Sequence, residues 1–90
     1  MTSPQRLRAR DDLTVISLDD EAVIYDEDTG NLHHLNQTAA LVFSMCDGTE
    51  SARELSASIA LAYGVDAGEI EPQVRSVLRT LKHQGLVAGA

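Results

Sequence analysis

The side chains best suited to metal binding or nucleophilic catalysis are His33, His34 and Cys46, which lie close together in the sequence. Imidazole and thiolate groups are common zinc ligands, and a thiolate beside a histidine can act as a nucleophile. A zinc site needs about four ligands with short spacings such as Cys-x-x-Cys. Because adjacent residues of a strand point to opposite faces, His33 and His34 would not chelate one ion. We therefore expect no metal site and no cofactor.

Cys46 belongs to a helical pattern, in which Ala39, Val42, Phe43 and Cys46 fall at positions i, i+3, i+4 and i+7. A cysteine on such a face is expected to be buried, where it behaves as a small apolar residue. Nucleophilic catalysis would instead need an exposed thiol of low pKa. We interpret the stretch around Cys46 as a strand, a helix cap and a helix, and we expect no catalytic activity.

Acidic residues cluster at 19–21 and at 26–28, where carboxylates could in principle bind Ca²⁺. Neither cluster has the regular spacing of acidic residues, Gly and a later Glu that a calcium-binding loop needs. Asp and Gly are common in turns, so both clusters are interpreted as turns between strands.

Three short runs rich in apolar and β-branched residues are separated by these turns. Their sequences are LTVISL at 13–18, EAVIY at 21–25 and NLHHL at 31–35. Short runs of this kind, bounded by Asp and Gly, are typical of strands joined by tight connections. The pattern predicts a three-stranded antiparallel meander.

Two helices are expected directly after the meander. Asn36 is a good N-cap for the first, because its side-chain oxygen can accept a free backbone N–H, and Gly48 supplies a stop. Ser51 and Glu54 have the spacing of a capping box, which predicts the start of the second helix. Gly64 is suited to end that helix in the left-handed conformation.

A third helix is expected to end at Gly85, and Pro72 complicates its start. Deep in a helix, proline loses a hydrogen bond and clashes with the preceding turn. The regular helix is therefore expected to begin near Glu71, with Pro72 in its first turn. Its apolar face consists of Val74, Val77, Leu78 and Leu81.

The predicted fold class is α+β, a three-stranded antiparallel β-meander followed by a three-helix cluster. This βββααα order is winged-helix-like, with the strands placed first. Residues 1–12 are polar and are expected to be flexible, while residues 13–87 are expected to form one domain.

Charge and composition exclude several classes of protein. The 90 residues include 14 acidic and 7 basic residues, a net charge of −7, which argues against a non-specific nucleic-acid binder. One cysteine excludes an internal disulfide. No apolar run approaches the roughly 20 residues of a membrane span, and no signal sequence is visible, so we expect a cytoplasmic protein without a membrane partner. The length suits a small binding module.

Three segments of the chain resemble the PqqD family. They are GNLHHLNQTAALVFSMCDG at 30–48, SARELSASIALAYGVD at 51–66 and VRSVLRTLKHQGLV at 74–87. Their order and spacing, taken together, carry the resemblance over about residues 13–87. One departure is that many members have paired aromatic residues in the third strand, where this chain has Leu32, His33 and His34.

The resemblance implies a recognition element for ribosomally made precursor peptides, a non-catalytic peptide chaperone. Such domains bind the leader segment of the precursor by β-strand addition and present it to a modifying enzyme, often a radical SAM maturase, in other pathways a peptidase or cyclase. In the family, the leader pairs with the third strand and packs against the third helix. The implied peptide-binding residues are Asn31, Leu32, His33, His34, Leu35, Val74, Arg75, Leu78, Arg79, Leu81 and Lys82.

Arg75, Arg79 and Lys82 fall at i, i+4 and i+7 of the third helix and form a basic stripe. The stripe is either a solvated helix face or a rim that pairs with acidic side chains of a leader. A winged-helix regulator that inserts this helix into the major groove is an alternative, although the net charge opposes it. An accessory subunit that binds no peptide, and a homodimer formed by pairing of a free strand edge, also stay open.

Overall fold

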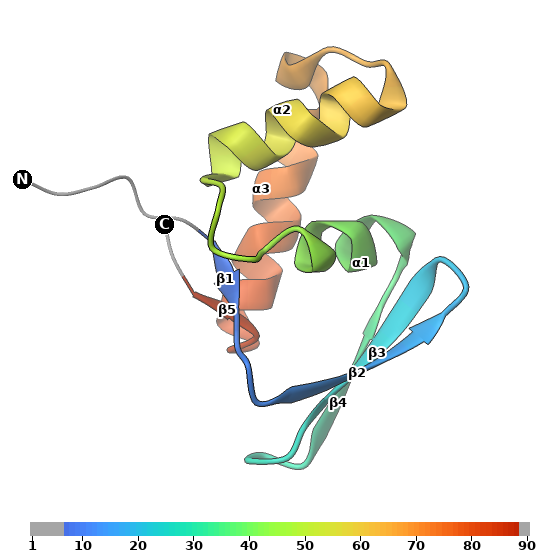
Figure 1. Ribbon diagram of the computed structural model, residues 1–90, viewed down its shortest axis with the longest axis vertical. Helices are drawn as coiled ribbons and strands as arrows, with labels where there is room; N and C mark the ends of the chain where they lie inside the picture. Colours follow the sequence, from blue (N-terminus) through green and yellow to red (C-terminus); the bar gives the residue numbers. More distant parts are fainter. Residues whose placement is uncertain (1–6, 89–90) are drawn as a thin grey trace, which may run out of the picture.

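The computed structural model describes residues 7–88, which fold into strands and helices in the predicted order (Figure 1). The elements are β1 (Arg8–Ala9), β2 (Leu13–Leu18), β3 (Glu21–Asp26), β4 (Asn31–Leu35), α1 (Gln37–Ser44), α2 (Ala52–Tyr63), α3 (Ala67–His83) and β5 (Val87–Ala88). The expected α+β class, a three-stranded meander followed by three helices, is confirmed. No helix within the described range is long and apolar enough to span a membrane.

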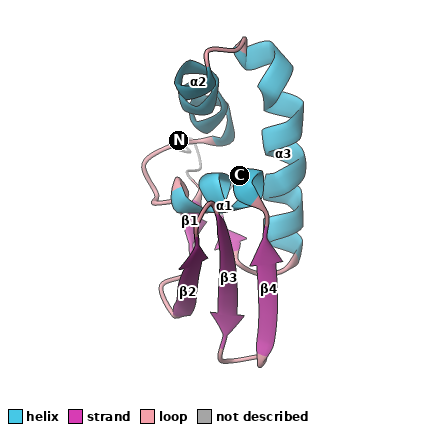
Figure 2. Cartoon of the chain, turned by 90° about the vertical axis from the view of Figure 1, so that its right-hand side faces the viewer, coloured by secondary structure: helices cyan, strands magenta, loops and turns pink. Residues whose placement is uncertain are grey.

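The three-stranded sheet has β3 at its centre and β2 and β4 at its edges (Figure 2). Ala22, Ile24 and Asp26 alternate along β3 and are buried on the face that meets the helices. Ile16 and Leu32 lie on the opposite face and are 49% and 68% exposed. One face of the sheet therefore packs on the core and the other is open to solvent, as is common for antiparallel sheets.

The core lies between this sheet and the three helices. In Figures 1 and 2, α1 lies between the sheet and the pair formed by α2 and α3. The buried side chains of the helices include Val42, Leu55, Ile59, Val74, Leu78 and Leu81. Those of α1 and α3 in this set come from the predicted apolar faces. Burial of these side chains supplies the main favourable term in folding.

The predicted caps are present at the first two helices. The N–H of Ala39 donates to Oδ1 of Asn36 at 2.9 Å, so Asn36 caps α1. Ser51 and Glu54 form the reciprocal bonds of a capping box at the start of α2. Gly64 ends α2 with φ of +68°, a conformation that favours glycine.

The start of α3 differs from the prediction. The helix begins at Ala67 rather than near Glu71, and Pro72 lies inside it. The additional turn brings Ile70 against the core. Pro72 lies only a few residues into the helix, where it removes a single backbone bond, and packing of Ile70 offsets that loss.

A second, two-stranded sheet joins the two ends of the chain, and the sequence pattern did not predict it. β1 pairs with β5 in antiparallel register, Arg8 opposite Ala88 and Ala9 opposite Val87. Leu7 is fully buried, so the region expected to be flexible joins the fold from this residue onward. Residues 1–6, the rest of that region, lie outside the described residues.

Candidate functional site

The edge strand β4 is the main candidate for a binding site. Its inner neighbour is β3, and no described strand pairs with its outer side. An unpaired edge presents backbone N–H and C=O groups to which another extended chain can bond. In Figure 2 the end of β4 reaches the lower part of α3, so a chain added at this end of the edge would lie near that helix.

A groove of about 250 Å³ separates the end of β4 from α3. Its apolar lining includes Leu35 and Leu81, which are almost fully buried, and the half-buried Val77. The rest of the lining is uncharged or histidine, and consists of His34, Asn36, Ala39, Ser76, Thr80 and Gln84. None of the described residues that line the groove is Lys, Arg, Asp or Glu, so it suits apolar and neutral polar side chains.

Short-range contacts hold the C-terminal end of β4 in place. The strand ends at Leu35, whose side chain is buried, and the next residue is the N-cap of α1. The hydrogen bond from Ala39 to Asn36 therefore holds the helix start against the strand end. Asn36 thus acts as a cap and also lines the groove.

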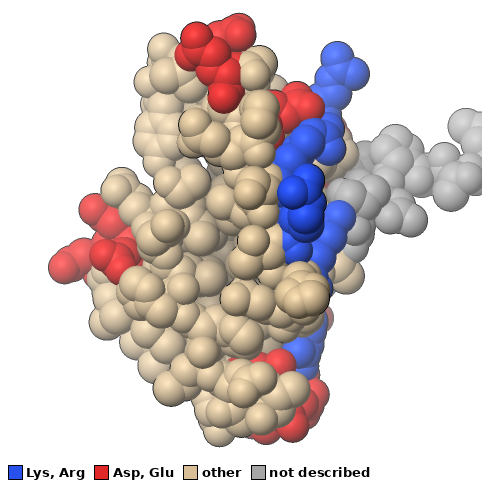
Figure 3. Space-filling model, turned by 180° about the vertical axis from the view of Figure 1, so that it is seen from behind, with Lys and Arg blue, Asp and Glu red and all other residues tan. Residues whose placement is uncertain are grey.

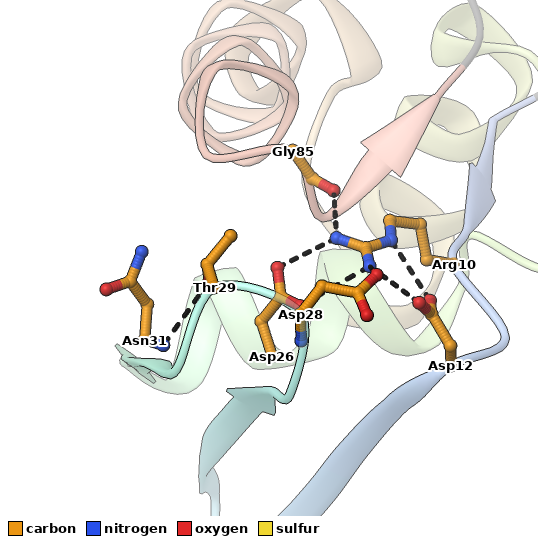
Figure 4. Close-up of polar contacts among 7 residues, drawn as sticks. All are labelled: Arg10, Asp12, Asp26, Asp28, Thr29, Asn31 and Gly85. Carbon is orange, nitrogen blue, oxygen red and sulfur yellow. Dashed lines mark hydrogen bonds and ion pairs between the residues drawn. The ribbon is translucent and has the colours of Figure 1, made fainter.

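A cluster around Arg10 fixes the opposite end of the sheet to α3 (Figure 4). The guanidinium donates to Asp26 at 2.8 Å, to Asp12 at 2.7 Å and to Asp28 at 3.1 Å. It also donates to the carbonyl oxygen of Gly85, just beyond α3, at 3.3 Å. Arg10 therefore links the β3–β4 turn to the end of the helix that forms the other wall of the groove.

The Arg10 cluster shifts the titration of its buried carboxylate. Asp26 is only 2% exposed, and its hydrogen bonds from Arg10 hold the pKa of this carboxyl below its usual range, against the opposing effect of desolvation. The same partner lowers the pKa of Asp12. Both side chains are therefore ionised at neutral pH, as the ion pairs require.

The two histidines of β4 lie on opposite faces, as the sequence predicted. His33 is opposite buried Ile24 in register, and His34 is opposite Val23. Nε2 of His34 lies 2.6 Å from Oε1 of Glu21 on the exposed face. Nε2 of His33 is buried and has no hydrogen-bond partner among the described residues. In residues 7–88, no group of three or more His, Cys, Asp or Glu side chains is arranged to hold a metal ion.

Cys46 is buried just beyond the end of α1, with 3% of its surface exposed. Its thiol donates to the carbonyl oxygen of Val42 at 3.2 Å. Desolvation raises the pKa of this thiol to about 11, and nearby Asp47 adds to the shift. The thiol is therefore protonated at neutral pH, which argues against a nucleophilic role.

The residues that the resemblance implied for peptide binding are distributed over several places. His34, Leu35 and Leu81 line the β4 groove, and Asn31, Leu32 and His33 belong to the same strand. Val74 and Leu78 are core residues, 0% and 3% exposed. Arg75, Arg79 and Lys82 line a different groove, together with Leu78 and Ala52.

The basic stripe thus lies on the flank of α3 away from β4. At about 100° per residue, the centre of the stripe and the centre of the groove-lining residues are about 160° apart around the helix. Figure 3 shows Lys and Arg side chains gathered in one band along the molecule. The groove residues that sequence reasoning missed on this side are Ser76, Val77 and Thr80 of α3 and its C-cap, Gln84. Their helical spacing was visible, but it did not indicate which flank faces β4.

Comparison with known proteins places the chain in a family. Residues 21–87 match the family described as Coenzyme PQQ synthesis protein D (PqqD). The chain belongs to the PqqD family. This match covers β3, β4, all three helices and the start of β5, and so includes both walls of the β4 groove. No protein with a curated description matches the chain significantly.

Two solved structures of similar size share the fold of this PqqD-family chain. TbiB1, in complex with the TbiA(beta) leader peptide, is 25% identical with a TM-score of 0.76, over 89% of this chain and 93% of TbiB1. Lasso peptide synthetase B1, complexed with the leader peptide, is 24% identical with a TM-score of 0.75, over 92% of this chain and 98% of that chain.

The heterocyclase TruD contains a similar fold within a much larger chain. It is 17% identical with a TM-score of 0.69, over 97% of this chain and 12% of TruD. The fold of the PqqD family thus occurs both as a small chain and as a minor part of an enzyme.

Proposed function

We propose that this chain binds the leader segment of a ribosomally synthesised precursor peptide as an additional strand along β4. The observation that carries the proposal is the free β4 edge beside a neutral groove on α3. Membership of the PqqD family and the likeness to TbiB1, which is in complex with a leader peptide, support it.

In strand addition, the backbone and the side chains of the bound peptide are recognised in different ways. Hydrogen bonds to the β4 backbone supply affinity with little dependence on sequence. Side chains of an added strand alternate, so every second one would point toward Leu35, Val77 and Leu81. Five residues of β4 at about 3.3 Å each span roughly 16 Å, which sets the length of leader that one edge can pair.

We infer that the chain performs no catalysis of its own and presents the bound precursor to a modifying enzyme. Holding the leader raises the effective concentration of the rest of the precursor at the active site of that enzyme. Candidate enzymes are a radical SAM maturase and a peptidase or cyclase. The protonated, buried thiol of Cys46 and the neutral groove are consistent with a binding role.

The direct test is a titration of ¹⁵N-labelled protein with the synthetic leader of the precursor peptide encoded beside the gene for this chain. We expect amide shifts along β4 and at Ser76, Val77, Thr80 and Gln84. A second series of leaders carries one N-methyl group at successive positions, which removes one N–H donor at a time. Because N–H groups alternate between the two sides of a strand, affinity should fall at every second position.

Shifts confined to the other edge strand, β2, would contradict the assignment of the site to β4. Equal effects of N-methylation at every position would contradict strand addition. An unrelated peptide of the same length and net charge serves as the control for binding by charge alone.

A further inference from the structure

The second groove on α3 is basic, and the leader-binding proposal does not use it. Arg75, Arg79 and Lys82 line this groove of about 220 Å³, whose remaining walls are Leu78 and Ala52. It adjoins a more open depression that shares Arg75 and Arg79 and also includes Gly68, Glu71 and Pro72. Arg75 and Arg79 thus line both hollows, and Lys82 lines the first.

The charges of this groove are only partly neutralised. Arg75 pairs with Glu71 one turn earlier, with Nε of the arginine 2.8 Å from Oε2. Arg79 and Lys82 form no ion pair within 4.0 Å with any residue of the described part of the chain. The wall also includes Ala52, the first residue of α2, and a helix start carries a partial positive charge. The groove is therefore a local positive site on a chain of net charge −7.

This basic groove is separate from the β4 groove. The linings have no residue in common, and they lie on opposite flanks of α3. The buried side chains of Val74, Leu78 and Leu81 hold the helix between them. A ligand in one groove therefore leaves the other open.

We propose that the basic groove docks an acidic segment of a partner protein while the β4 groove stays free to hold a peptide. The acidic character of the partner is inferred from charge complementarity. Arg79 and Lys82 lack an ion pair within the described residues, and Arg75 pairs with Glu71. Arg75 to Lys82 span about 10 Å along the helix, which three or four extended residues can cover. The proposal rests on these charges and does not depend on the proposed function.

An acidic polypeptide fits this groove better than a nucleic acid. Specific binding to duplex DNA uses many phosphate contacts over a large surface, whereas the basic groove offers three cations. The acidic turns at 19–21 and 26–28 and the net charge oppose a long polyanion.

The probe for this proposal is acetylated, amidated hexaglutamate, titrated into ¹⁵N-labelled full-length protein at ~0.05 M salt, where charge interactions are weakly screened. We expect amide shifts at residues 75–82 and at Ala52, and none along β4. Raising the salt to ~0.3 M should weaken binding at least about 5-fold. Hexaglutamine of the same length should cause no shifts.

Two double variants with the same change in net charge separate the groove from the overall charge. Arg79→Gln with Lys82→Gln removes two positive charges from the groove and should weaken hexaglutamate binding at least about 5-fold. Thr14→Glu with Ser17→Glu adds two negative charges at exposed positions of the edge strand β2 and should change the affinity less than about 2-fold. Circular dichroism checks that both variants are folded.

Three outcomes would overturn the proposal. The first is the absence of amide shifts at residues 75–82 at hexaglutamate concentrations up to roughly 5 mM, since binding weaker than this is far below typical peptide recognition. Equal losses in the two double variants would mean that net charge alone governs binding. Tighter binding of duplex DNA than of hexaglutamate through the same residues at ~0.15 M salt would assign the groove to nucleic acid instead.

Discussion

The two flanks of α3 offer different means of recognition on one helix. The flank beside β4 presents an open strand edge and an uncharged groove, so it can bind a backbone and select apolar side chains. The groove on the other flank presents three cations, and its described lining comes from helices alone, so it offers charge rather than a strand edge. Main-chain pairing tolerates many sequences, whereas exposed ion pairs mainly affect selectivity and association rate. The helix can therefore support two partners of different chemistry.

The largest expected effects come from the apolar residues that separate the two flanks. Leu78→Ala and Leu81→Ala each remove a buried side chain and should lower the free energy of unfolding by about 2–5 kcal/mol. Urea denaturation followed by circular dichroism measures this loss. A loss below about 1 kcal/mol in either variant would mean that α3 is not packed between the grooves as described.

A charge placed in the β4 groove should affect peptide binding more than a charge placed in the basic groove. Val77→Asp puts a carboxylate among apolar walls and should weaken leader binding about 10-fold or more, because that carboxylate loses water when the peptide binds. Arg79→Glu, on the other flank, should leave leader affinity within about 3-fold, since exposed ion pairs contribute little. Isothermal titration calorimetry of both variants measures the difference. Equal losses of leader affinity would mean that the leader binds to both grooves.

The contribution of Arg10 to the stability of the folded chain should depend on pH. Asp26 has a lowered pKa in the folded chain, so its ion pair contributes stability above the ordinary value of 3.8 and loses that contribution as the pH falls through the lower folded value. Arg10→Gln should therefore lower Tm at pH 7, and the difference from the unaltered chain should shrink toward pH 2. Thermal unfolding between pH 2 and pH 7 tests this expectation.

The matched control for Arg10→Gln is Arg53→Gln, the same change at an exposed position of α2. Its effect on Tm should be small across the same pH range. If Arg10→Gln also weakens hexaglutamate binding as much as leader binding, the Arg10 cluster supports both grooves rather than the one beside β4.

The smallest expected effect concerns the single ion pair of the basic groove. Arg75→Gln removes the contact with Glu71 on the helix surface and should cost about 0.3–0.5 kcal/mol of unfolding free energy. Leader binding should not change. Urea denaturation in low salt and in high salt measures this, since the difference between the two proteins should vanish when the charges are screened.

Local patterns predicted much of this fold because they depend on neighbouring residues. The bounds of β2 and β4, the cap at Asn36 and the capping box that begins at Ser51 all agree with the structure. The start of α3 was predicted wrongly, because packing of Ile70 against the core outweighs the local cost of Pro72. The pairing of β1 with β5 had no local signal, since each strand is two residues long and its partner lies at the other end of the chain.

Only part of the candidate site could be predicted, because only part of it depends on residues that are neighbours in the sequence. The strand that forms one wall, Asn31–Leu35, could be found from its pattern and from the PqqD resemblance. Of the opposite wall only Leu81 was predicted, because the helical period identifies the buried face of α3 but does not distinguish its two flanks. The Arg10 cluster was also missed, since Arg10, Asp26 and Gly85 are far apart in sequence and meet only in the folded chain.

The sequence by itself determined the order of the three-stranded meander and the helices, the caps of α1 and α2 and the apolar faces of α1 and α3, because these follow from side-chain periodicity and short-range hydrogen bonds. The tertiary structure alone decided which flank of α3 meets β4 and which carries the isolated cations. That choice depends on how the sheet docks against the helices, which is fixed by contacts between segments distant in the sequence. A neutral groove beside a free strand and a basic groove behind it are the consequence.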